Sequence, residues 1–105
     1  TLETAMHTLK IPFETRALNH LQSLSEQLEE QLGEKADVDF HEGILTIEFE
    51  NGDQYLLNLH KPTQQIWLSS PKSGAHHFSW NETGDRWVST RDTTVLKELL
   101  KSELQ

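Results

Sequence analysis

The chain has 105 residues, of which 34% are hydrophobic, and a formal net charge of −8. This length and composition predict one globular domain, residues 1–105, and the sequence has no apolar run of the roughly 20 residues that a membrane-spanning helix needs. The lack of cysteine excludes disulfides, a thiolate zinc site and cysteine ligation of an iron-sulfur cluster.

A long amphipathic helix is the first predicted element. Its apolar residues recur every three or four positions, at Leu2, Met6, Leu9, Phe13, Ala17, Leu21, Leu24, Leu28 and Leu32. Pro12 interrupts this stripe, which indicates either a kink or a main helix that starts there. Gly33 is the expected end of the helix.

Carboxylates are concentrated from the end of this helix onward. Between residues 26 and 53 the acidic side chains face only Lys35 among lysines and arginines; they are Glu26, Glu29, Glu30, Glu34, Asp37, Asp39, Glu42, Glu48, Glu50 and Asp53. Such a region repels phosphate, so we expect neither nucleic acid nor a membrane as a partner. It favours cations or a basic protein surface.

Six short strands follow, beginning near Val38. Gly43 separates the first two, and Asn51-Gly52 is a two-residue hairpin signal between the second and third. The later strands are the one around Trp67, then 75–80 and 86–90. Asp92 or Thr93 is expected to cap a last helix with an apolar stripe at Val95, Leu96, Leu99, Leu100 and Leu104. The prediction is an α+β two-layer sandwich, αββββββα, with both helices on one face of an antiparallel sheet.

The strand that begins at Gln65 carries a tryptophan on its polar side. With a period of two, Ile66 and Leu68 share one face. Gln65, Trp67 and Ser69 share the other. A tryptophan at such a position can be half-buried by its neighbours or exposed to solvent, and the alternation alone does not distinguish the two. A large indole beside glutamine and serine favours a docking site for a partner protein.

The residues around this tryptophan resemble a known family. The run QIWLSSPKSG from Gln65 to Gly74, followed by Phe78, Trp80 and Arg86-Trp87-Val88, is similar to the signature of the frataxins. The resemblance implies an iron-binding accessory and regulatory protein of iron-sulfur cluster assembly. Its implied partners are a cysteine desulfurase and the iron-sulfur scaffold protein. It also implies a protein that is mainly monomeric, with iron-driven oligomers as an option, in the mitochondrial matrix or, alternatively, the bacterial cytoplasm.

The acidic residues supply the candidate metal ligands. Glu26, Glu29 and Glu30 lie three and four apart, so they project from one side of the first helix. Asp37 and Asp39 lie two apart on a strand and point the same way, and the short link after Gly33 could place them beside the helix end, giving an acidic ridge. Exposed carboxylates suit Fe²⁺, Mn²⁺, Ca²⁺ or Mg²⁺ without selecting among them.

A solvated polar face is the ordinary reading of such a charge run. The resemblance favours iron instead: it implies weak binding of Fe²⁺, with Fe³⁺ as an option, and no organic cofactor. Its acidic positions fall on Glu26, Glu29, Asp37 and Asp39, while two others are Gln22 and Ser25 here. Binding weaker than in more acidic relatives is therefore expected, with Glu30 and Glu34 as further carboxylates.

The candidate partner-binding residues are also implied by the resemblance. They are the sheet positions Asn58, His60, Gln65, Trp67 and His77. His77 occupies a position where an arginine is common in the family, so a contact that needs positive charge there would depend on pH. His76 is adjacent in a strand and is expected on the opposite face, so the two histidines cannot chelate one ion.

Neither a Ser/His/Asp nucleophile arrangement nor a glycine-rich phosphate loop is recognisable in the sequence. The second hypothesis is a ferroxidase or iron-storage protein that oxidises Fe²⁺ to Fe³⁺, although the sequence has no paired Glu-x-x-His motif. A third is an acidic adaptor protein unrelated to iron. None of His7, His20, His41 or His60 has the spacing of a zinc site, and each is expected to be a surface or capping residue.

Overall fold

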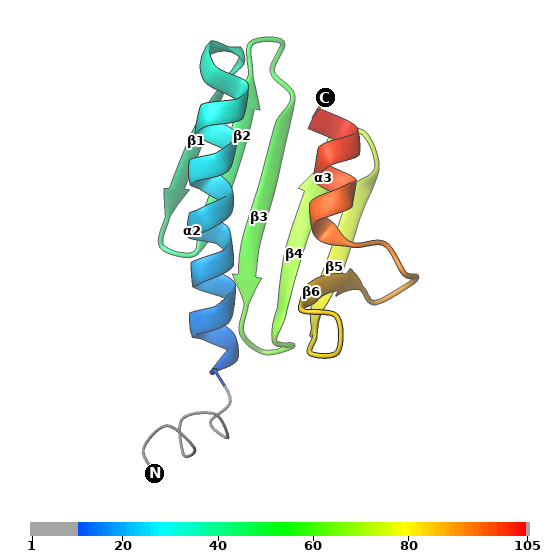
Figure 1. Ribbon diagram of the computed structural model, residues 1–105. Coiled ribbons are helices and arrows are strands. Elements are labelled where there is room, and N and C mark those ends of the chain that lie inside the picture. The colour runs from blue at the N-terminus through cyan, green and yellow to red at the C-terminus, as the bar shows by residue number, and fades with distance from the viewer. Residues whose placement is uncertain (1–10, 105) are drawn as a thin grey trace.

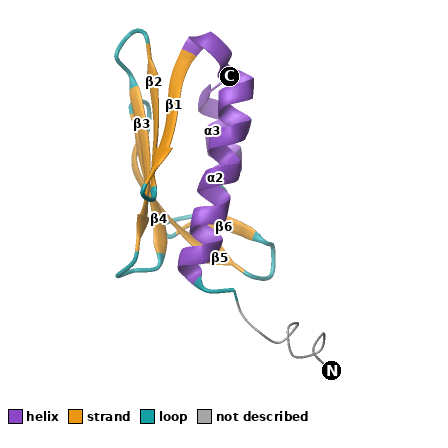
Figure 2. Ribbon diagram, turned by 90° about the vertical axis from the view of Figure 1, so that its left-hand side faces the viewer, coloured by secondary structure: helices purple, strands orange, loops and turns teal. Residues whose placement is uncertain are grey.

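The computed structural model describes residues 11–104. They form a sheet of six antiparallel strands in the order β1-β2-β3-β4-β5-β6, with both α-helices on one of its faces (Figure 1 and, edge-on, Figure 2). The elements are α2 (Phe13–Leu32), the 3-10 helix η1 (Gly33–Lys35), β1 (Ala36–His41), β2 (Ile44–Phe49), β3 (Gln54–His60), β4 (Gln65–Ser70), β5 (Gly74–Asn81), β6 (Arg86–Ser89) and α3 (Leu96–Leu104). The predicted α+β sandwich and its order are confirmed.

Helix α2 begins directly after Pro12, so the second of the two interpretations of this proline is correct. The carbonyl of Pro12 accepts a hydrogen bond from the backbone N–H of Arg16 at 3.0 Å, and the proline has no N–H that the helix would have to satisfy. Gly33 follows the last helical residue with φ +54°, as expected. Leu2, Met6 and Leu9 of the predicted stripe lie outside the described residues.

The core lies between the helices and the inner face of the sheet. Apolar side chains of α2 and α3 form one cluster with inward-facing residues of the strands, and α2 lies mainly over β1, β2 and β3. Burying each leucine or isoleucine contributes about 1.5–3 kcal/mol. Residues with 0% exposure include Ala17, Leu21, Leu45, Ile47, Leu57, Ile66, Phe78 and Leu96. This packing fixes which face of every strand points away from the helices.

Asn51-Gly52 lie between β2 and β3, which form a hairpin as predicted, but the two-residue turn of this sheet lies between β1 and β2 instead. Glu42 and Gly43 join β1 to β2 with φ of +50° and +79°, the paired positive values of a type I′ turn. Asn51 and Gly52 instead lie in a loop of residues 50–53, where the Asn51 side chain accepts a hydrogen bond from the backbone N–H of Asp53. The side-chain hydrogen bond favours the longer loop.

The predicted cap of the last helix is also corrected. Helix α3 starts at Leu96, whereas the Asp92 carboxylate accepts a hydrogen bond from the backbone N–H of Thr94 at 2.9 Å, in a turn before the helix. Val95 first makes an isolated bridge with Val88 of β6. This bridge keeps the backbone extended and delays the start of α3.

The end of α3 is fastened to the sheet by Glu103. Its carboxylate accepts hydrogen bonds from Tyr55 Oη at 3.0 Å, Ser70 Oγ at 2.5 Å and Ser73 Oγ at 2.6 Å. Burial raises the pKa of Glu103, but these three donors outweigh it and hold the pKa below its ordinary value. Burial raises the pKa of Tyr55 to about 12, and its bond to Glu103 adds to the rise. The network joins α3 to β3 and to the end of β4.

We predict that Glu103→Gln destabilises the protein, because the neutral amide accepts these hydrogen bonds less strongly. The expected loss in the free energy of unfolding is about 2 kcal/mol. The pKa of Glu103 is lower in the folded state than in the unfolded state, so its carboxylate stabilises the folded protein at pH values above the unfolded-state pKa. This stabilisation is lost as the pH falls through the folded-state pKa. The difference between wild type and variant should therefore shrink in acid.

Denaturant unfolding measured across a pH series checks this prediction. Glu98→Gln, at an exposed position of the same helix, is the matched control and should leave stability nearly unchanged. Equal stability of Glu103→Gln and the wild type at neutral pH would contradict the role given to this network.

Candidate functional site

The helix carboxylates of the predicted ridge lie on the solvent side of α2. Glu26, Glu29 and Glu30 are all exposed, opposite the buried leucine stripe, as their spacing predicts. The Glu26 carboxylate accepts one hydrogen bond, from Gln22 Nε2 at 3.1 Å. Side chains that are so little constrained are able to bind a cation, but their geometry is not preset for one.

The strand carboxylates point to the other side of the molecule. Asp37 pairs with Glu48 and Asp39 pairs with Thr46 in the β1–β2 ladder, on the outer face of the sheet. The two aspartates do share one direction, as predicted, but it leads away from the layer that contains α2. The predicted ridge is therefore divided between the two layers at the β1 edge.

A shallow cleft of about 210 Å³ lies at this edge. Its lining includes the carboxylate residues Glu34, Asp37, Glu48 and Glu50 together with Lys35. Glu48 and Glu50 are not among the metal ligands predicted from the sequence. Their approach to Asp37 depends on the antiparallel register of β1 and β2, which only the structure shows. Within residues 11–104, no three His, Asp or Glu side chains are grouped closely enough to form a metal site.

The candidate partner-binding residues, in contrast, are assembled on the outer face. Asn58 pairs with Trp67 across β3 and β4, and Trp67 pairs with His77 across β4 and β5. His60 pairs with Gln65. All five are half-buried, and Ile66 and Leu68, 0% and 2% exposed, occupy the inner face. The five predicted positions thus form one continuous patch on three neighbouring strands (Figure 1).

Trp67 is stacked between two imidazole rings, an arrangement that the sequence did not suggest. The ring centroids of His60 and Trp67 are 3.6 Å apart with planes 12° from parallel, and those of Trp67 and His77 are 4.1 Å apart at 9°. The indole Nε1 donates a hydrogen bond to Gln65 Oε1 at 2.9 Å, and His60 Nδ1 lies 2.7 Å from Thr63 Oγ1. The indole is therefore outside the core yet firmly held.

His76 lies on the opposite face of the sheet from His77. It pairs with the inward-facing Leu68, and its Nε2 lies 2.8 Å from Ser73 Oγ. The prediction that these adjacent histidines cannot chelate one ion together is confirmed by the register.

His20 is neither a surface residue nor a cap, in contrast to the expectation. It is half-buried, and its ring lies against Trp87 with centroids 6.1 Å apart. Burial lowers the pKa of His20, and the charge of Lys97 lowers it further, so the imidazole is neutral near neutral pH. We assign it to the packing of the core.

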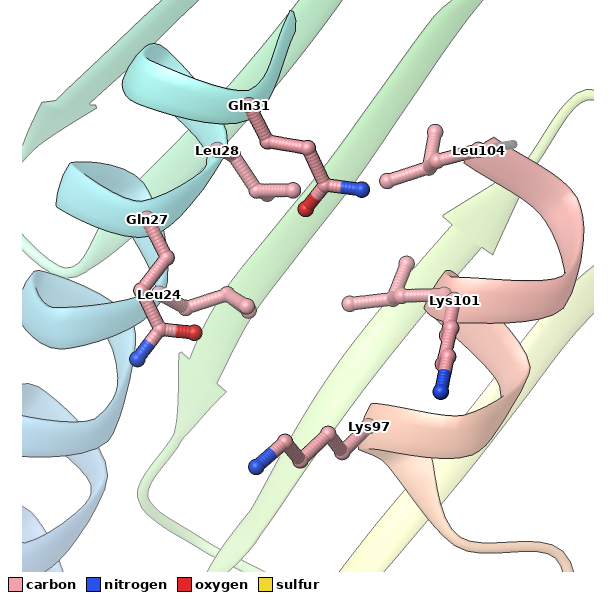
Figure 3. A pocket seen from close by; sticks show the side chains of 8 residues that line it. Leu24, Gln27, Leu28, Gln31, Lys97, Lys101 and Leu104 are labelled. Atoms are coloured by element: carbon pink, nitrogen blue, oxygen red, sulfur yellow. The ribbon is translucent and has the colours of Figure 1, made fainter.

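A further cavity lies in the groove between the two helices (Figure 3). It has a volume of about 280 Å³, with leucines of α2 and α3 beneath and Gln27, Gln31, Lys97 and Lys101 at its rim. No acid, histidine or hydroxyl group that could act as a catalyst lines it. Within the described residues, no helix is long and apolar enough to cross a membrane.

Comparison with known proteins agrees with this geometry. Residues 8–105 match the family model described as "Frataxin-like domain". The chain belongs to the frataxin family. It is 37% identical over 82% of its length to the mitochondrial frataxin homolog of Schizosaccharomyces pombe, and 35% identical over 79% of its length to the iron-sulfur cluster assembly protein CyaY of Azotobacter vinelandii.

Solved frataxins have the same fold. Trimeric frataxin from Saccharomyces cerevisiae with its full-length N-terminus superposes with a TM-score of 0.77 at 32% identity, covering 98% of this chain and 86% of that one. The trimeric yeast protein complexed with ferrous iron gives a TM-score of 0.71 at 31% identity, with 99% and 94% covered. The chain spans 55% of the length of the S. pombe protein and 74% of that of the A. vinelandii protein.

Proposed function

We propose that this protein is an iron-binding accessory and regulatory protein of iron-sulfur cluster assembly. It binds Fe²⁺ weakly through exposed carboxylates and modulates a cysteine desulfurase–scaffold complex through the outer face of its sheet. The observation that carries the proposal is the assembled patch around Trp67, on the face of the sheet opposite α2 and α3. The names of its relatives, frataxin and iron-sulfur cluster assembly protein, support the same reading.

The iron-binding part of the proposal rests on the β1 edge. Glu26, Glu29 and Glu30 are exposed on the solvent side of α2, and Asp37 and Asp39 lie on the outer face of β1. Oxygen ligands of this kind suit Fe²⁺, and their exposure and their division between two layers imply low affinity. A solved yeast relative is complexed with ferrous iron, which supports the choice of metal.

The partner-binding part rests on two surfaces of different character. The acidic edge is complementary to a basic surface, and we assign it to the desulfurase. The patch of Asn58, His60, Gln65, Trp67 and His77 offers a large ring with hydrogen-bonding groups around it, and we assign it to the scaffold. By analogy with its relatives, the protein would act in the mitochondrial matrix, or alternatively in the bacterial cytoplasm.

Ferroxidase and iron-storage activity is the second candidate function. The trimeric yeast relatives, one with ferrous iron bound, favour an iron-driven oligomer as the form in which it would occur. A dedicated ferroxidase centre needs clustered carboxylates and histidine, and residues 11–104 do not assemble such a group. Iron-dependent consumption of oxygen would distinguish this function from the accessory role.

Titration with Fe²⁺ under anaerobic conditions tests the iron-binding part. Backbone NMR signals of Glu26, Glu29, Glu30, Asp37 and Asp39 should broaden first, because a paramagnetic ion acts on the nearest nuclei. Replacing both Asp37 and Asp39 by asparagine should weaken the binding of Fe²⁺ by about tenfold, because each substitution removes the free energy of about one surface ion pair. Glu98→Gln, on α3, is the control. Unmoved signals at the five carboxylate residues would refute this site.

Cysteine desulfurase turnover, measured with the scaffold and with or without this protein and Fe²⁺, tests the partner-binding part. Trp67→Ala should reduce the effect on turnover by about tenfold or more, because it removes a central aromatic contact. Trp67 lies outside the core, so the variant should fold, which circular dichroism checks. A folded Trp67→Ala protein that still alters turnover like the wild type would contradict the assignment.

A further inference from the structure

The outer face of the sheet is divided by charge. Carboxylates occur on its β1–β2 part, where Asp37 pairs with Glu48 and Asp39 lies two residues further on. The ladders place the following residues of β3 to β6 on the same face: Gln54, Leu56, Asn58, His60, Gln65, Trp67, Ser69, Ala75, His77, Ser79, Asn81, Arg86 and Val88. None of them is acidic, in a chain with 17 acidic residues.

The three stacked rings lie at the centre of this acid-free part. They come from three neighbouring strands, so the direction of stacking runs across the strands. Rings stacked in this direction direct their edges, rather than their faces, away from the sheet. Both faces of the Trp67 indole are covered, and its N–H is already bonded to Gln65. A partner therefore meets the rims of three rings, two of which carry imidazole nitrogens.

Protonation would change the character of this surface. Histidine is the side chain whose charge ordinarily changes between about pH 5 and 8. An imidazolium ring over an indole face gains a cation–π attraction, so the stack tolerates the charged form. Charging His60 or His77 would convert a neutral aromatic layer into a cationic one that donates hydrogen bonds.

One carboxylate outside the strands lies near the stack: Glu82, in the loop after β5, lines a cleft with Thr63, the residue that contacts His60. Among the described residues, Glu82 forms no ion pair with His60 or His77. Lys61, next to His60, is paired with Glu14 of α2 at 2.9 Å. The neighbours of the stack on β3, β4 and β5 are uncharged, and Arg86 on β6 is positive. The acidic residues of this face, and His41, lie on β1 and β2, at the far edge of the sheet from β6. A new positive charge on the stack would be available to a partner.

We propose that His60 and His77 make the outer face a proton-dependent docking surface for a carboxylate-bearing segment of the scaffold. The inference rests on the proposed scaffold contact and specifies its chemistry. Affinity should rise as the imidazoles become charged. Added salt should reduce the effect, because the contact is electrostatic.

The test uses the full chain with the scaffold protein and its desulfurase. Affinity for the complex is measured by calorimetry at about pH 8 and about pH 6. Wild-type affinity should increase by about two- to fivefold at the lower pH. The double variant His60→Phe/His77→Phe keeps flat rings on both sides of Trp67 but cannot be protonated, and its affinity should not change with pH. His41→Gln, an exposed histidine of the same face outside the stack, should behave like the wild type.

Fluorescence of the isolated protein gives an independent readout. A protonated imidazole in contact with an indole quenches its emission, so Trp67 emission should fall as pH falls. Subtracting the spectrum of Trp67→Phe removes the contribution of Trp80 and Trp87. The quenching should be lost in the double phenylalanine variant. Emission of Trp67 that does not change with pH would overturn the inference without reference to any partner.

The binding outcomes separate this inference from the proposed function. Equal pH dependence in the wild type and in the double variant would overturn the role of the two histidines and leave the scaffold contact standing. Wild-type protein that binds the complex at neither pH would overturn both. If the affinity of His41→Gln did not change with pH, the pH dependence would come from the β1 edge and not from the stack. This result would also overturn the inference.

Discussion

The alternation of side chains along β4 is the constraint on which the candidate site depends. Ile66 and Leu68 are buried between the sheet and the helices, so Trp67 has to lie on the outer face. A slip of one residue would put both apolar side chains in water and the indole on the inner face of the sheet, at a cost of several kcal/mol. Because β4 lies between β3 and β5, the same constraint aligns Asn58 and His77 with Trp67.

The same alternation separates the charged groups into two environments. On β1 the half-buried residues Ala36, Val38 and Phe40 face inward, which directs Asp37 and Asp39 outward. These carboxylates therefore share a face with Trp67, but β2 and β3 lie between β1 and the strand that carries Trp67. A metal ion at the β1 edge and a protein segment over the stacked rings would not compete for the same atoms.

Much of this architecture could be predicted from local patterns. The leucine stripe of α2 and the alternation of β2 and β4 depend on residues close in sequence, and each was assigned to the correct face. What could not be predicted depends on partners distant in sequence. The approach of Glu48 to Asp37 is set by the type I′ turn at Glu42-Gly43, where glutamate gives no turn signal. The start of α3 is set by the bridge between Val88 and Val95.

The stack around Trp67 shows why a ring outside the core can still be well ordered. Cross-strand aromatic pairs contribute about 0.5–1.5 kcal/mol each beyond the area they bury. Two such pairs and one hydrogen bond hold the indole in a single orientation before any partner arrives, which lowers the entropy lost on binding. The other end of β4 is held by Ser70, which donates to Glu103 of α3. The helix layer thus supports the outer face through the strand that joins them, and loosening α3 would reduce the order of the docking surface as well as the stability of the core.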